Sequence, residues 1–89
     1  MHTVEKQALN VSPNPSSTII TITTQVTNTN KPTELKVTDI LGNIILTKIL
    51  IQNYDKTLLP VADLDAGLYQ CTIYQDGKAI LNSKLAVIH

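Results

Sequence analysis

The sequence of 89 residues contains no arginine, tryptophan or phenylalanine, and it has one cysteine and three glycines. Arginine is the residue best suited to bidentate recognition of phosphate and carboxylate groups. Seven lysines balance seven acidic residues to a net charge of +0, so the chain lacks the basic surface of a nucleic-acid-binding protein. We therefore expect no nucleic-acid partner and no nucleotide or phosphate site.

Few residues in the sequence are suited to catalysis or to metal binding. His2 and His89 lie near the two ends of the chain, and Cys71 has no second cysteine for a disulfide or a zinc site. A nucleophile needs an activating base, and most of the aspartates stand in turn-forming contexts. We expect a protein that is not an enzyme, with no cofactor and no metal, in which Cys71 is buried.

Long hydrophobic runs are also missing. The longest apolar-rich run, residues 44–51, contains a lysine, and it is far shorter than the roughly 20 apolar residues that cross a bilayer as a helix. We see no signal-peptide pattern. The sequence therefore predicts no transmembrane segment.

Threonine, isoleucine and valine are abundant instead, and these β-branched residues favour strands. Turn signals recur every 8 to 12 residues or so, a spacing typical of sandwiches and barrels. The predicted strands cover about residues 8–12, 18–25, 34–40, 44–51, 57–61, 68–75 and 79–88. We predict one all-β domain over residues 8–89, an immunoglobulin-like antiparallel β-sandwich of about seven strands, preceded by a linker or expression remnant over residues 1–7.

Alternation along these strands predicts which side chains face the core. The residues expected to point inward are Ile20, Ile22, Leu35, Val37, Tyr69, Cys71 and Ile73. Residues 44–51 are apolar on both faces, which predicts a central strand or a strand covered by a partner. Pro60 predicts a short or edge strand, and Asp76-Gly77 predicts a type I′ turn that joins the last two strands.

The stretch from Asp65 to Cys71, DAGLYQC, is similar to the entry of strand F in immunoglobulin domains. There, a tyrosine two residues before the cysteine forms the tyrosine corner. We expect Tyr69 to form such a corner. The partner cysteine and the core tryptophan of antibody domains are missing, so the similarity is to a sandwich corner.

Four motifs then follow one another in order. They are Pro-Asn-Pro at 13–15, VTDILGN at 37–43, LDAGLY at 64–69, and a lysine-containing end with GK at 77–78 and SKLAV at 83–87. Together they resemble the type A C-terminal sorting domain of the type IX (Por) secretion system. The residues that carry the resemblance, and the expected recognition motif, are Pro13, Asn14, Pro15, Asp39, Gly42, Leu64, Gly67, Tyr69, Gly77, Lys78, Lys84 and Leu85.

The resemblance implies a non-catalytic secretion signal. Such a domain directs a cargo protein fused to its N-terminal side from the periplasm across the outer membrane to the cell surface or the exterior. The implied partners are the outer-membrane translocon with its shuttle and sortase components, and weak homodimerisation through an edge strand is a further option. The alternative is an accessory β-sandwich of a secreted enzyme, structural or carbohydrate-binding, for which Tyr54 and Tyr74 would supply any exposed aromatic surface.

Overall fold

The computed structural model describes residues 7–13, 18–27 and 30–89. β-branched residues, which favour strands, are most frequent in the strand IITITTQ at residues 19–25. Within the described ranges, no helix is long and apolar enough to cross a membrane. The strands are β1 (Ala8–Ser12), β2 (Ile19–Gln25), β3 (Thr33–Asp39), β4 (Ile44–Ile49), β5 (Tyr54–Pro60), β6 (Gly67–Gln75) and β7 (Lys78–Val87).

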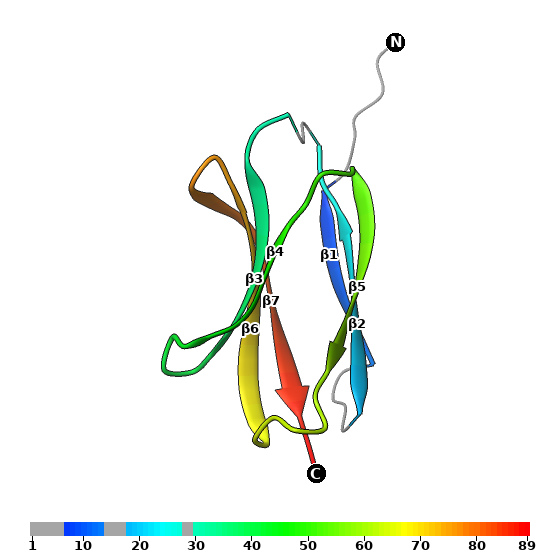
Figure 1. Ribbon diagram of the computed structural model, residues 1–89, viewed down its shortest axis with the longest axis vertical. Helices are drawn as coiled ribbons and strands as arrows, with labels where there is room; N and C mark the ends of the chain where they lie inside the picture. Colours follow the sequence, from blue (N-terminus) through cyan, green and yellow to red (C-terminus); the bar gives the residue numbers. More distant parts are fainter. Residues whose placement is uncertain (1–6, 14–17, 28–29) are drawn as a thin grey trace.

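The strands form two antiparallel sheets that pack face to face (Figure 1). One sheet has the order β1-β2-β5, and the other has the order β4-β3-β6-β7. The predicted all-β sandwich is confirmed. In constant-type immunoglobulin domains the fourth strand pairs with the fifth, whereas here β4 pairs with β3 and the chain then crosses to β5 in the other sheet.

The core lies between the two sheets and consists mostly of aliphatic side chains. All of the predicted inward-facing residues are buried, and Val26, Leu50, Leu59, Val61, Leu85 and Val87 join them. Burial of one such aliphatic side chain contributes roughly 1.5–3 kcal/mol. Burial also raises the pKa of the Cys71 thiol to about 12, so Cys71 is a protonated core residue at neutral pH.

Of the two predictions for residues 44–51, the structure contradicts the central strand, while cover by a partner stays a prediction. β4 lies at the edge of the four-stranded sheet, next to β3 alone. Its outer face exposes Ile44 and Ile49, while Ile45 and Leu46 pack against the core. Alternation reveals which faces of a strand are apolar but not which strands flank it, and β4 has two apolar faces although one of them meets solvent.

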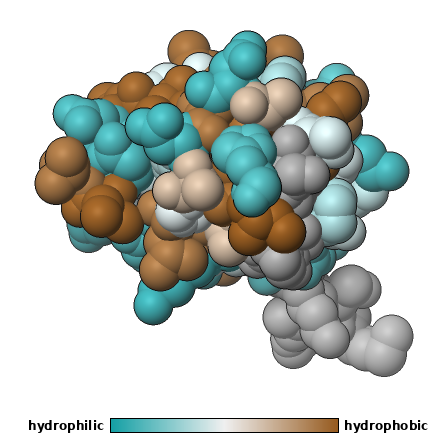
Figure 2. All heavy atoms as spheres, turned by 90° about the horizontal axis from the view of Figure 1, so that it is seen from below, coloured by the Kyte–Doolittle hydropathy of each residue, from teal (hydrophilic) through white to brown (hydrophobic). Residues whose placement is uncertain are grey.

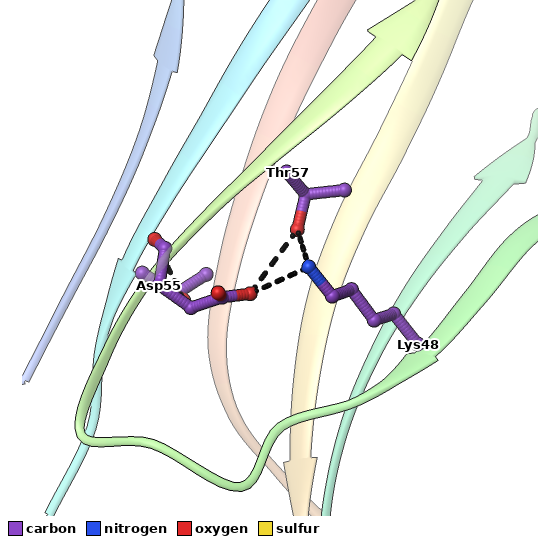
Figure 3. A network of polar contacts seen from close by, with 4 residues as sticks. Lys48, Asp55 and Thr57 are labelled. Carbon is purple, nitrogen blue, oxygen red and sulfur yellow. Dashed lines mark hydrogen bonds and ion pairs between the residues drawn. The ribbon is translucent and has the colours of Figure 1, made fainter.

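Lys48 points inward from this edge, across the gap between the two sheets. Its Nζ lies 2.7 Å from Asp55 Oδ2 and donates to Thr57 Oγ1 at 3.0 Å, both on β5 (Figure 3). Thr24 Oγ1 on β2 in turn donates to the Asp55 carbonyl at 3.3 Å. An inward-pointing charge at a sheet edge disfavours the addition of another strand there.

The predicted strand ends are accurate except around the crossover between the sheets. β4 ends at Ile49 because Leu50 turns into the core, and β5 begins at Tyr54, where it pairs with Gln25 of β2. The other strands differ from the predicted bounds by at most one residue at each end. Pro60 ends β5 at the edge of the three-stranded sheet, which confirms the edge position.

The hairpin between β6 and β7 has the predicted two-residue turn. Asp76 has a φ of 54° and Gly77 a φ of 80°, and Gln75 pairs with Lys78 on either side of them. Positive φ at both central residues is what a type I′ turn requires.

Gly77→Ala should lower the free energy of unfolding by about 1 kcal/mol, since alanine is disfavoured at positive φ. A Cβ at this position would meet no atom within 4 Å, so the cost comes from the backbone alone. Gly77→Asn should cost less, because asparagine tolerates the left-handed region. Urea denaturation of the three proteins measures the difference, and equal midpoints for glycine and alanine would contradict this account of the turn.

Candidate functional site

The two ends of the sandwich carry different motifs (Figure 1). We call the end with the β3–β4 turn, the start of β6 and the end of β7 the turn pole. The opposite end, with the start of β1 and the β6–β7 hairpin at Asp76-Gly77, is the hairpin pole. β6 has nine residues, and at about 3.3 Å per residue it separates the poles by about 30 Å.

The β3–β4 turn at the turn pole is built around the Asp39 carboxylate. Oδ1 accepts hydrogen bonds from the backbone N–H groups of Leu41 at 2.9 Å and Asn43 at 2.8 Å, and Oδ2 accepts one from Asn43 Nδ2 at 3.0 Å. These bonds, first among them that from the Asn43 side chain, lower the pKa of the Asp39 carboxyl below its ordinary value of 3.8. Asp39 therefore stays ionised and directed into its own turn at neutral pH.

The backbone of the same turn is closed by two further hydrogen bonds. The Asp39 N–H donates to the Asn43 carbonyl at 3.0 Å, and the Gly42 N–H donates to the Asp39 carbonyl at 3.1 Å. Gly42 has a φ of 86°, a conformation that favours glycine. The turn leaves Ile40 and Leu41 at its tip with 79% and 82% of their surface exposed.

The tyrosine corner predicted at Tyr69 is confirmed. The Tyr69 hydroxyl donates to the Asp65 carbonyl at 2.6 Å, and its ring is buried. Leu64 packs against the core, and its carbonyl oxygen lies 2.7 Å from Nε2 of His89. The contact between Leu64 and His89 thus joins the loop before β6 to the residues after β7.

A hollow of about 380 Å³ lies between these features at the turn pole. It is lined by the end of β3, Gly42 of the turn, Leu68 and Tyr69 of β6, and Lys84 of β7. Leu68 and Lys84 both project from the outer face of the four-stranded sheet, because the residues that follow each of them, Tyr69 and Leu85, are buried and paired with each other. The hollow therefore has apolar and cationic groups at its rim.

Most of the predicted motif residues gather at this pole. Those that do are Asp39, Gly42, Leu64, Gly67, Tyr69, Lys84 and Leu85, of which Leu85 and Tyr69 are buried. Pro13 follows β1 at the same end, whereas Asn14 and Pro15 lie outside the described residues. Gly77 and Lys78 lie at the hairpin pole, so they cannot contact a partner at the same place as Lys84.

Ile40, Leu41 and Leu68 are exposed apolar residues of the turn pole that were not among the predicted site residues, and Ile44 and Ile88 are exposed at the same end. Figure 2 views this pole from below and shows apolar side chains gathered on the side of the β3–β4 turn. A signal was present in the sequence. Two large aliphatic residues stand between Asp39 and Gly42. Asp39 and Gly42 shape the turn, and this turn directs the two aliphatic side chains away from the core.

The described residues offer neither a metal centre nor an aromatic platform. They contain no group of three or more histidine, cysteine, aspartate or glutamate side chains that could hold a metal ion. Tyr69 is buried. Tyr54 belongs to the three-stranded sheet and Tyr74 to the four-stranded sheet, where Lys36 Nζ lies 5.2 Å from its ring centroid. The burial patterns put the two tyrosines on the outer faces of opposite sheets, so they do not form one flat aromatic surface.

These features define a small β-sandwich with a tyrosine corner and a partly apolar pole. The family model described as the secretion system C-terminal sorting domain matches residues 10–88. The chain belongs to this family. It is a non-catalytic signal domain for secretion through the Por (type IX) system. That system takes its cargo across the outer membrane to the surface or the exterior, and the domain acts by interaction with the secretion machinery. No curated protein matches the chain.

Proposed function

We propose that this chain is a type A sorting domain whose turn pole is recognised by the outer-membrane translocon with its shuttle and sortase components. The observation that carries the proposal is the convergence at one pole of three segments that are distant in sequence. They are the β3–β4 turn, the corner before Tyr69 and the Lys84 region of β7. Residues 8–89 act as one recognition unit, and residues 1–7 link it to the cargo.

Fixed geometry supports recognition of the folded shape. The turn is held by side-chain and backbone hydrogen bonds, and the corner is held by the Tyr69 hydroxyl. A surface that is already ordered loses little conformational entropy when it binds. The Lys84 side chain adds a charged group at the rim of the hollow, and such groups contribute to specificity and association rate.

The position of β1 supports attachment of the cargo on the N-terminal side. β1 begins with Ala8 at the hairpin pole, about 30 Å from the turn pole by the rise of β6. A cargo domain that precedes this strand would leave the turn pole uncovered. The signal could then be read in the periplasm for cargoes of different shapes before transfer to the surface or the exterior.

Export of a reporter fused ahead of the domain tests the proposal in a host with type IX machinery. We expect the intact fusion outside the cell. Lys84→Ala should reduce export about tenfold or more, a change that corresponds to about 1.4 kcal/mol of lost interaction, and the retained protein should be folded in the periplasm. Lys78→Ala, at the opposite pole, is the matched control and should be exported like the parent.

The outcomes separate the function from the site. Retention of the intact fusion, while the same cells export another substrate, would refute the sorting function. Export of the Lys84→Ala variant at the parent level would show that Lys84 does not contribute to recognition. Each surface substitution should change stability by at most about 0.5 kcal/mol, so urea denaturation of the purified variants shows that the fold is intact.

We also propose that weak homodimerisation, through an edge strand other than β4, accompanies this function. The inward-pointing Lys48 and its ion pair with Asp55 disfavour pairing at β4. Sedimentation velocity over a range of protein concentrations tests for the dimer, and a monomer at all concentrations would refute it.

A further inference from the structure

We propose that Ile40 and Leu41 form an apolar knob that inserts into an apolar pocket of a protein of the secretion machinery. In this arrangement Asp39, Gly42 and Asn43 are positioning residues that hold the knob. The inference rests on the proposed recognition at the turn pole, and it assigns the contact to residues that the sequence motif leaves unspecified.

The first support is the exposure of consecutive large aliphatic side chains. Isolated exposed apolar residues are common on protein surfaces, whereas a gathered apolar patch marks an interaction site. Ile40 and Leu41 are adjacent at the tip of the turn, and Leu68 is exposed nearby. A second hollow of about 260 Å³ is lined by all three residues, so the knob and Leu68 belong to one surface.

The second support is the rigidity of the turn. The Asp39 carboxylate accepts a hydrogen bond from the backbone N–H of Leu41 itself at 2.9 Å, and two more from Asn43. The backbone bonds between Asp39 and Asn43 and between Gly42 and Asp39 close the loop. A knob held in this way keeps its direction before binding, which reduces the entropy lost on association.

The third support is the use of the Asp39 oxygens. Both oxygens of the carboxylate accept hydrogen bonds within the turn. The carboxylate is therefore committed to the turn conformation, and the side chains that project from the tip are Ile40 and Leu41. This explains why a motif of aspartate and glycine would mark a surface whose contacts are apolar.

Charge favours a protein pocket over a lipid surface. Asp63 and Asp65 lie exposed in the corner loop at the same pole as Asp39. Segments that bind membranes present lysine and arginine to anionic lipids. Lys84 is a cation at the same pole, but the carboxylates of Asp39, Asp63 and Asp65 outnumber it. Anionic lipids would repel these carboxylates, whereas an apolar pocket with a polar or cationic rim would accept both the knob and its surroundings.

Export of the same reporter fusion tests the knob directly. The variant Ile40→Ser with Leu41→Ser should be exported about tenfold less than the parent, with an unchanged urea midpoint and a folded domain in the periplasm. The matched control is Ile49→Ser with Ile51→Ser, because these side chains are similarly exposed, at 68% and 79%. They flank Leu50 next to the start of β3, away from the turn pole. The control should be exported like the parent.

Substitutions of Asp39 separate positioning from direct contact. Asp39→Ala removes the acceptors that hold the turn and should lower export although Ile40 and Leu41 remain. Asp39→Asn keeps the Oδ1 acceptor for the Leu41 and Asn43 N–H groups, and it should retain clearly more export than the alanine variant. Asp39→Asn also loses the Oδ2 acceptor for Asn43 Nδ2, so its urea midpoint is measured alongside export. Equal losses of export in both variants, with the parent midpoint kept in Asp39→Asn, would indicate that the negative charge itself contacts the partner, which would overturn the positioning role.

Three other results would overturn the proposal. Parent-level export of the Ile40/Leu41 serine variant would refute the knob while the exported parent still upholds the sorting function. If the Ile40/Leu41 and Ile49/Ile51 serine variants were retained in the periplasm to the same extent, export would depend on exposed apolar residues in general and not on the knob. Binding of the purified domain to protein-free vesicles of phosphatidylethanolamine and phosphatidylglycerol, lost in the Ile40/Leu41 variant, would identify a lipid partner; absence of such binding supports the protein pocket.

Discussion

Tyr69→Ala is expected to lower the free energy of unfolding by about 3–5 kcal/mol, as for other truncations of large buried aromatic residues. The substitution removes a buried ring from β6 and the hydroxyl that donates to the Asp65 carbonyl at 2.6 Å. A domain of this size has about 4–13 kcal/mol of stability in total. The variant therefore loses a large share of it, and urea denaturation followed by circular dichroism measures the loss.

Tyr69→Phe removes the hydroxyl and keeps the ring, so it measures the contribution of the hydroxyl alone. It should cost about 1–2 kcal/mol, because the hydrogen bond is lost but the packing remains. Tyr54→Phe removes the same atom from an exposed position on β5 and should change stability by less than about 0.5 kcal/mol. If Tyr69→Phe behaved like Tyr54→Phe, the corner would not depend on its hydrogen bond.

Ile73→Ala is expected to lower the free energy of unfolding by about 2–5 kcal/mol. Ile73 is fully buried on β6, where it pairs with Leu35 of β3 and Leu81 of β7. Removal of its side chain would leave a cavity between the sheets that the surrounding strands can close only in part. The midpoint of urea denaturation should fall accordingly.

Ile49→Ala is the matched control for the core substitution. Ile49 lies exposed on the edge strand β4, so the same change there should cost less than about 1 kcal/mol, mostly through lower strand propensity. Similar losses at both positions would mean that strand propensity, and not the cavity, sets the effect. Because the proposed signal is a folded shape, Ile73→Ala should also reduce export of a fused reporter.

The turn pole shows how a sorting motif can combine two kinds of residue. Asp39 and Tyr69 make hydrogen bonds within the domain, and Gly42 supplies the positive φ that the turn needs. Ile40, Leu41 and Lys84 project from the domain. Under the proposals above, the first group determines the shape of the surface and the second makes the contacts.

The sequence by itself determined the features that depend on local chemistry. Alternation identified the inward-facing residues from Ile20 to Ile73, since successive side chains of a strand point to opposite faces. Asp76-Gly77 identified the hairpin turn through its need for positive φ, and the spacing before Cys71 identified the Tyr69 corner. Each of these signals lies within a few residues of the structure that it predicts.

Only the tertiary structure decided which strands and side chains are neighbours. It placed β4 at an edge, paired Lys48 with Asp55 across the two sheets, and put Lys78 and Lys84 toward opposite ends of the same strand. It also joined the β3–β4 turn, Leu68 and Lys84 around one hollow. These relations depend on strand order and on packing between segments distant in sequence, and hydrophobic alternation carries no information about the partner that a strand selects.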